Sequence, residues 1–86
     1  MKIHKQLVKR NIAGDVILVP VGDASLELKG LLTLNETGER IWDLLPDAAS
    51  EDEIFQALLE EYDVEPSVLR TDVDAFFAKL RELAII

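Results

Sequence analysis

The chain has 86 residues, of which 49% are hydrophobic and 30% are charged, and its formal net charge at pH 7 is −8. A chain of this length forms one domain with one core, spanning residues 1–86, and leaves little room for a deep catalytic cleft. It has no cysteine, no apolar run near the roughly 20 residues of a membrane helix and no apolar block typical of a secretory signal. This excludes disulfides and thiolate metal sites and favours a cytoplasmic protein.

The first third of the chain predicts a β-meander that begins with a hairpin. Residues 5–12 alternate partly between apolar and polar side chains. The short sequence Ala-Gly-Asp then supplies a turn before the β-branched, apolar run at residues 16–21. Pro20 has no amide hydrogen, so its end of this second strand should lie where the ladder is unpaired.

A third strand is predicted over residues 26–34, after a turn at residues 22–25. It begins with a clear alternation, and Gly30 within it suggests a bulge or a close backbone approach. One outer strand of a three-stranded antiparallel meander is an edge, and an edge is a template for an added strand. Lys29 and Gly30 should limit nonspecific pairing there.

The first helix is predicted to begin at Asn35, whose side chain suits the N-cap, and to end at Pro46. Acidic residues follow the cap in the first turn, where the helix dipole favours negative charge. Thr33 with Glu36 offers a competing capping-box start. The apolar stripe that should face the core is Ile41, Trp42 and Leu45.

Two further helices follow. Residues 50–53 form a capping box for the second, and Pro66 suits the first turn of the third. Their predicted core stripes are Ile54, Leu58, Leu59 and Tyr62 in the second, and Leu69, Val73, Phe76, Phe77, Leu80 and Leu83 in the third, with Ile85 and Ile86 folding back onto the core. Three strands followed by three helices predict an α+β fold, with the helices on one sheet face, that is similar to a winged helix-turn-helix with its wing first.

The chain offers few groups for catalysis. His4 is the sole histidine and has no candidate partner, so a serine or cysteine nucleophile system is not expected. The acidic residues match no calcium loop, and no glycine-rich phosphate loop occurs. Asp72 and Asp74 are a poor acid/base pair, because side chains two apart on a helix point in different directions. We therefore predict no enzyme activity, no catalytic residue, no metal and no cofactor, and a small enzyme that depends on His4 is the least favoured alternative.

The charge is unevenly distributed along the chain. Between Glu36 and Glu65 there are eleven acids and one base, Arg40, whereas four of the nine bases lie in the first ten residues. Nucleic-acid binding draws much of its affinity from Lys and Arg on phosphates, so the acidic helical region argues against it and suits a basic partner. A winged-helix DNA-binding regulator is the alternative function that this pattern weakens.

Phe76 and Phe77 are adjacent aromatic residues on the third predicted helix, about 100° apart around its axis. One apolar stripe easily buries one of them. The other either completes the core or lines a recognition groove, and the sequence leaves both interpretations open.

Three segments taken together resemble the PqqD family, the small proteins of pyrroloquinoline quinone biosynthesis and their relatives, also called RiPP recognition elements. The segments are "RNIAGDVILVPVG", "LKGLLTLNETGERIWDLL" and "EDEIFQALLEEYDVEPSVLRTDVDAFFAKLRELAII", which cover nearly the whole chain. The most specific parts are "LNETGERIWDLL" and "DVDAFFAKLRELAII". The order and spacing of the segments carry the resemblance. The chain departs from the family in the turn after the first helix, where "PDAAS" stands in place of an Asp-Gly turn.

The resemblance implies a non-catalytic peptide chaperone. Such a protein binds the leader of a ribosomally made precursor peptide and presents it to a modifying enzyme, often of the radical-SAM type. The leader would add as a strand beside the third strand, in the groove between that strand and the third helix. The site residues carried over at this level are Leu28, Lys29, Gly30, Leu31, Leu32, Thr33, Leu69, Val73, Phe76, Phe77 and Leu80. The expected partners are the leader and the modifying enzyme, with neither nucleic acid nor membrane, and the edge strand also allows a homodimer.

Overall fold

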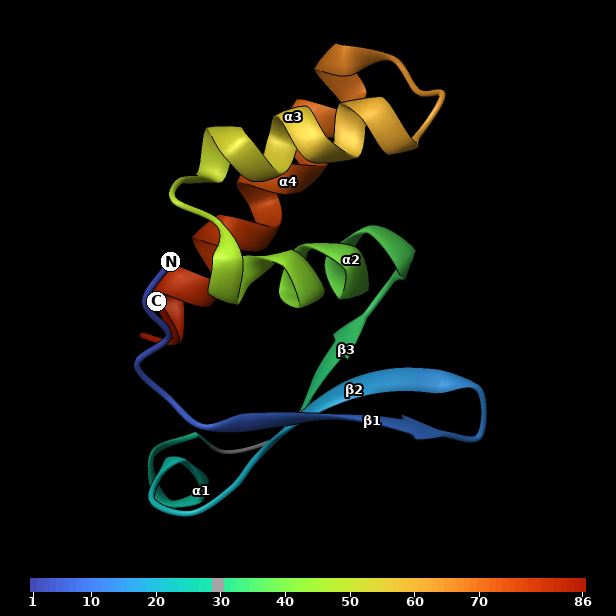
Figure 1. Ribbon diagram of the computed structural model, residues 1–86. Coiled ribbons are helices and arrows are strands. Elements are labelled where there is room, and N and C mark those ends of the chain that lie inside the picture. The colour runs from blue at the N-terminus through green and yellow to red at the C-terminus, as the bar shows by residue number, and fades with distance from the viewer. Residues whose placement is uncertain (29–30) are drawn as a thin grey trace.

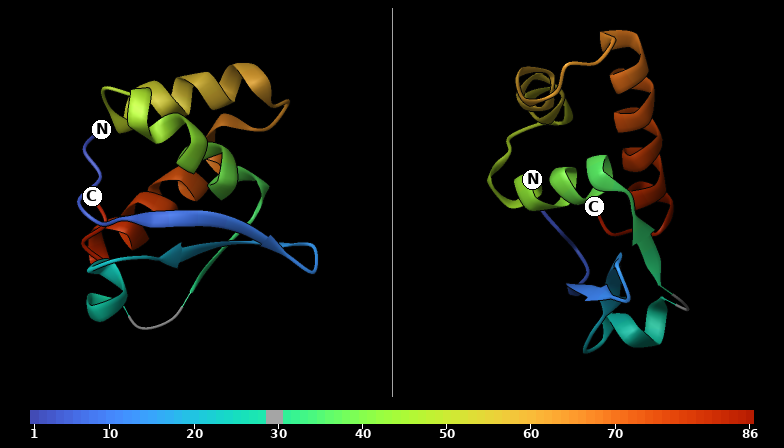
Figure 2. Two further views of the ribbon diagram at one scale, coloured as in Figure 1. Left: turned by 60° about the horizontal axis from the view of Figure 1, so that its bottom comes forward. Right: turned by 90° about the vertical axis from the view of Figure 1, so that its right-hand side faces the viewer.

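The computed structural model of the protein describes residues 1–28 and 31–86. The elements in chain order are β1 (Leu7–Ile12), β2 (Asp15–Pro20), α1 (Ala24–Glu27), β3 (Leu32–Leu34), α2 (Glu36–Leu44), the short 3₁₀ helix η1 (Leu45–Asp47), α3 (Glu51–Glu61) and α4 (Pro66–Glu82). The long helices α2, α3 and α4 gather on one side of the sheet, whereas α1 lies at the opposite end of the molecule (Figures 1 and 2).

The sheet is antiparallel, with the strand order β1-β2-β3, so β2 is central and both neighbours are edges. β1 pairs with β2 from Leu7 opposite Pro20 to Ile12 opposite Asp15. β3 pairs with Val16–Leu18 and stops short of Pro20, as expected for a residue that cannot donate to a ladder. The predicted α+β class, a three-stranded antiparallel sheet followed by three main helices, is confirmed.

The prediction of a strand over residues 26–34 is wrong for its first part. Residues 24–27 form one helical turn, in which the Leu28 amide donates to the Ala24 carbonyl at 2.9 Å. Gly22 begins this turn with a φ of +59°. Ala24 is 5% exposed and Leu26 is 81% exposed, so the alternation read from the sequence does not describe which side chains face inward. The paired strand is Leu32–Leu34, and Lys29 and Gly30 lie outside the described residues.

The hairpin between β1 and β2 closes through two residues with left-handed backbone. Ala13 has a φ of +52° and Gly14 a φ of +86°. Positive φ at both central residues is the arrangement that matches a two-residue hairpin to the twist of its strands. Glycine adopts it without strain, but an alanine side chain does not.

The helix caps follow the sequence closely. The Asn35 side chain accepts from the Gly38 amide at 2.8 Å, so Asn35 starts α2. The competing start at Thr33 is wrong, because Thr33 lies inside β3. The Ser50 hydroxyl accepts from the Glu53 amide, and the Glu53 carboxylate accepts in return from the Ala49 amide, both at 3.2 Å. This arrangement satisfies backbone donors at the start of α3 that have no partner within the helix.

The core is formed mainly between the helices. Its buried members are Ile41, Leu45, Ala48, Ile54, Phe55, Leu58, Leu69, Val73, Phe77, Leu80 and Ile85, with Trp42, Leu59, Tyr62, Phe76 and Leu83 partly buried against it. The predicted stripes of all three helices therefore face this core. Phe55 belongs to it as well, which the predicted stripe of the second helix omits. The sheet contributes Leu18, which is 1% exposed, and the less completely buried Ile17 and Leu34.

The C-terminus folds back onto the core through a Schellman turn. Ala84 has a φ of +56°, its amide donates to Arg81 O, and the Ile85 amide donates to Leu80 O at 2.8 Å. The turn buries Ile85 to 1% exposure, as predicted. The Ile85 carbonyl then accepts from the His4 amide at 2.7 Å, which holds the N-terminal segment beside the end of α4 (Figure 1).

The strained hairpin position gives a stability prediction. We expect Ala13→Asn to raise the free energy of unfolding by about 0.5–1 kcal/mol, because asparagine tolerates left-handed backbone better than alanine. Ala13→Val should lower it, because a β-branched side chain is least tolerated at positive φ. Urea denaturation of the three proteins measures both differences, and an unchanged midpoint for Ala13→Asn would contradict the assigned turn.

Candidate functional site

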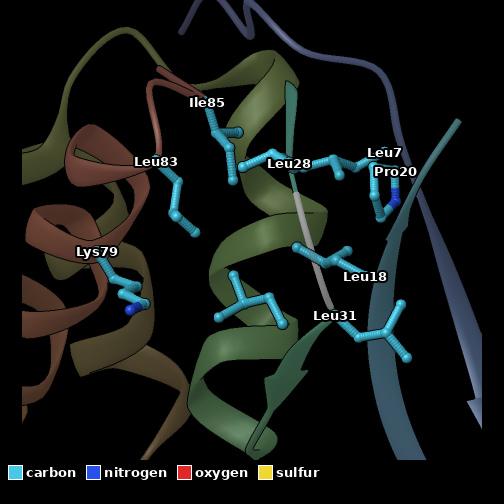
Figure 3. Close-up of a pocket in the computed structure, with 9 residues that line it drawn as sticks. Leu7, Leu18, Pro20, Leu28, Leu31, Lys79, Leu83 and Ile85 are labelled. Carbon is cyan, nitrogen blue, oxygen red and sulfur yellow. The ribbon is translucent and has the colours of Figure 1, made fainter. Parts of the chain in front are cut away.

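A cavity of about 150 Å³ lies where the sheet meets the C-terminal end of α4 (Figure 3). Its lining residues are Leu7, Leu18, Pro20, Leu28, Leu31, Leu32, Lys79, Leu83 and Ile85. Lys79 and Leu83 stand on the α4 side, and Leu7 and Pro20 stand on the strand side, as Figure 3 shows. Among the described residues that line it, Lys79 is the one that is charged, and the others are apolar. This first cavity can therefore take an apolar side chain, and the Lys79 cation lies at its margin.

A second cavity of about 250 Å³ adjoins the first and lies between the start of α2 and the middle of α4. Asn35 and Gly38 line it from α2, and Phe76 and Lys79 line it from α4. Lys79 is common to the two cavities. The two cavities therefore meet at Lys79 along α4, and we call the pair the α4 groove.

Gly38 sets how closely the two walls of the second cavity approach. A Cβ atom at this position would lie 3.3 Å from Phe76 Cε1 and 3.2 Å from Asn35 Oδ1, closer than ordinary side-chain contacts. The glycine thus lets the Phe76 ring lie against α2 beside the cap of that helix.

The α4 groove and the core use neighbouring stripes of the same helix. Asp72, Phe76, Lys79 and Leu83 are spaced by three or four residues, so they share one face. The neighbouring stripe is buried and lies about 100° further around the helix axis. Its members are Leu69, Val73, Phe77 and Leu80. Of the adjacent aromatic residues, Phe77 is 0% exposed, whereas Phe76 is partly buried and lines the second cavity.

The site residues expected from the sequence divide into two groups in the structure. Leu28, Leu31 and Leu32 come together in the first cavity, Phe76 lines the second, and Thr33 is exposed on β3. The other group, Leu69, Val73, Phe77 and Leu80, is between 0% and 3% exposed and lies inside the core. Val73, Phe77 and Leu80 support the groove from beneath, and Leu69 also lines a further cavity beside the turn between α3 and α4.

The sequence analysis did not include several residues that form the groove. They are Leu7, Leu18, Pro20, Leu83 and Ile85 in the first cavity, Asn35, Thr37, Gly38, Ile41, Asp72 and Ala75 in the second, and Lys79 in both. In the sequence, these groove residues of α4 could have been found from one pattern. Polar and apolar residues share the helix face beside the buried stripe. The cavities depend on how distant segments meet, which periodicity alone does not reveal.

The outer side of β3 is the second element of the site. β2 occupies one side of β3, and within residues 1–28 and 31–86 no strand occupies the other. Leu31 and Leu32, at the start of this strand, line the first cavity. An edge with open main-chain groups therefore lies beside an apolar groove, and Leu31 is 60% exposed at the junction.

The basic residues of α4 face acidic partners. Arg70 lies 2.7 Å from Asp52, Arg81 lies 3.3 Å from Glu51, and Lys79 lies 3.9 Å from Glu82. Arg70 also stacks on the Phe55 ring at 3.9 Å from its centroid. These contacts leave α4 without the unpaired basic face that a DNA-recognition helix presents to phosphates.

The described part of the chain also lacks two features that would indicate other functions. None of its helices has the length and apolar character needed to cross a membrane. No group of three or more His, Asp or Glu side chains is placed to hold a metal ion.

The fold and site define a small α+β domain in which an edge strand borders a groove against the last helix. Residues 16–86 match the family described as Coenzyme PQQ synthesis protein D (PqqD), and the chain belongs to this family. A solved structure described as TbiB1 in complex with the TbiA(beta) leader peptide is similar, with 27% sequence identity and a TM-score of 0.71 over 99% of this chain and 93% of that chain. No curated protein matches the chain. The family resemblance seen in the sequence is confirmed, and nothing in these comparisons supports a DNA-binding regulator.

Substitutions of the two adjacent aromatic residues should lower the free energy of unfolding by different amounts. We expect Phe77→Ala to lower the free energy of unfolding by about 3–5 kcal/mol, because it removes a fully buried ring from the core. Phe76→Ala should cost about 1–2 kcal/mol, because that ring already faces the groove. Urea denaturation tests the difference, and equal losses would contradict the assignment of one ring to the core and the other to the groove.

Proposed function

We propose that this protein binds the leader segment of a ribosomally made precursor peptide and presents it to a modifying enzyme, without catalysing a reaction itself. The observation that carries the proposal is the open edge of β3 beside the apolar first cavity of the α4 groove. Membership of the PqqD family supports it, as does the likeness to a protein whose solved structure holds a leader peptide.

In the proposed complex the leader adds as a strand to the outer edge of β3. Main-chain hydrogen bonds then supply affinity that does not depend on sequence, and side chains at alternate positions supply selectivity. β3 has three residues, so the ladder is short and the groove must contribute much of the binding free energy. We expect a dissociation constant in the micromolar to submicromolar range, about −8 to −9 kcal/mol.

The proposed contacts are drawn from the accessible members of the predicted site. Leu28, Leu31 and Leu32 receive apolar side chains in the first cavity, Thr33 lies along the strand edge, and Phe76 contacts the peptide in the second cavity. The core stripe of α4 acts indirectly, by holding the groove in shape. The proposed partner enzyme is of the radical-SAM type, and the proposed location is the cytoplasm.

The direct test is a titration of the leader peptide of the precursor encoded beside this gene. Fluorescence anisotropy of the labelled synthetic leader gives the dissociation constant, and amide NMR shifts show where it binds. Shifts centred on β3 and α4 support the proposal. Saturable binding with shifts confined to β1 or α3 would overturn the assigned groove.

A matched pair of leucines separates loss of the site from loss of the fold. Leu31 is 60% exposed and lines the first cavity, whereas Leu26 is 81% exposed and lies in α1 outside that lining. Leu31→Asp should weaken leader binding at least about 10-fold, because it places a charge at the apolar entrance.

Leu26→Asp is the control, since it makes the same change at an exposed position. It should leave the affinity within about 2-fold. Both variants should unfold near the wild-type urea midpoint. Equal affinities for the two variants would contradict a role for the first cavity.

A further inference from the structure

The α4 groove continues beyond the end of β3 into a third cavity. This cavity, of about 180 Å³, lies at the α3–α4 turn, and Tyr62, Val64 and Val68 contribute to its lining. It shares Thr37 and Asp72 with the second cavity. The three cavities therefore lie in a row along α4, from its first turn to its last, although the strand edge borders only part of the row.

The third cavity exposes apolar side chains that nothing in the described chain covers. Val64 is 45% exposed and Val68 is 57% exposed, and both are among the few large hydrophobic residues at the surface. Val64 lies in the connection from α3 to α4 and Val68 in the first turn of α4, so the two valines reach one opening. Apolar surface gathered in a concavity favours an apolar side chain from a ligand.

The charge at this end of the groove is negative. Glu36 and Asp72 line the third cavity, and among the described residues neither has an ion-pair partner. Burial raises the pKa of the Tyr62 hydroxyl, and the negative charge of Glu36 raises it further. The first cavity, toward the other end of α4, has Lys79 at its margin, and Glu82 lies 3.9 Å from that ammonium group.

The length of the groove fixes how much peptide it holds. Val68 and Leu83, the C-cap of α4, are fifteen positions apart, which at 1.5 Å per residue is about 22 Å. An extended chain rises about 3.3 Å per residue, so about seven peptide residues cover that distance. β3 pairs over three residues, Leu32–Leu34. A peptide bound along the whole groove therefore has a part that no strand pairing holds.

We propose that the third cavity is a second anchor site, which takes an apolar side chain flanked by Lys or Arg from the same leader peptide, about five to seven residues from its anchor in the first cavity. The inference rests on the proposed function and extends it. Continuity of the lining assigns this occupant, because a peptide leaving the β3 edge along α4 meets Asp72 and then Val68. A second copy of the chain fits less well, since it brings another net charge of −8 to an acidic opening.

The test uses a display library of random 16-residue peptides, selected on the full-length protein. We expect enriched peptides to carry two apolar positions five to seven residues apart, one of them beside Lys or Arg. In a synthetic peptide of this kind, replacing the outer apolar residue by Ser and its basic neighbour by Gln should weaken binding about 10-fold.

Variants of the protein locate the second anchor. Val68→Ser should weaken binding of the full peptide about 5-fold. It should leave the affinity for the peptide that lacks the outer anchor unchanged. The control is Ile12→Ser, a β-branched residue of matching exposure, 56% against 57%, at the hairpin far from the groove. Glu36→Gln with Asp72→Asn should weaken the full peptide about 3-fold at low salt and reduce the salt dependence of binding.

The outcomes separate the two proposals. Peptides with a single apolar anchor, whose binding responds to Leu31→Asp but not to Val68→Ser, overturn the second anchor and leave the proposed function standing. If no enriched peptide responds to Leu31→Asp, the proposed function fails and this inference fails with it.

Discussion

The structure depends on how α4 divides its surface between the core and the groove. One stripe of this 17-residue helix is almost fully buried against α2, α3 and the returning C-terminus. The next stripe, which includes Phe76 and Lys79, is left open because the sheet meets only the C-terminal end of the helix. A core of this size cannot cover both stripes of a long helix. The groove therefore lies along the stripe of α4 that the core does not cover.

Two close contacts keep that opening in a defined shape. Gly38 allows the start of α2 to approach Phe76, and the Schellman turn at Ala84 directs Ile85 into the wall of the first cavity. Neither residue carries a functional group. Their contribution is backbone geometry, which determines where the leucines of β3 and the side chains of α4 lie relative to one another.

Local signals in the sequence predicted most of the fold. Asn35, Ser50 and Pro66 mark helix starts through their own side chains or ring, so their effect does not depend on distant contacts. The error at residues 24–27 arises because their conformation does depend on distant contacts. Four residues are too few for periodicity to separate a helical turn from a strand, and the burial of Ala24 depends on tertiary packing.

The candidate site was predicted at the level of its elements and less well at the level of side chains. The apolar stripe of the third predicted helix correctly marks residues in contact with the rest of the protein. It cannot distinguish a residue covered by the core, such as Val73, from one that borders an open cavity, such as Leu83. Val73 and Leu83 differ in which segments of the chain pack opposite them, and the pattern along one helix does not contain that information. For the same reason the sequence left the roles of Phe76 and Phe77 open, and the structure assigns one to the core and the other to the groove.

The shortness of β3 also has a kinetic consequence. A ladder of three residues forms few main-chain hydrogen bonds with an added strand, so it cannot by itself hold a peptide for long. A complex of micromolar affinity that forms at about 10⁶ M⁻¹ s⁻¹ dissociates about once per second. In the proposed role, a leader held in this way would exchange about once per second. In the proposed role, the brief strand edge makes the protein a carrier with a short residence time.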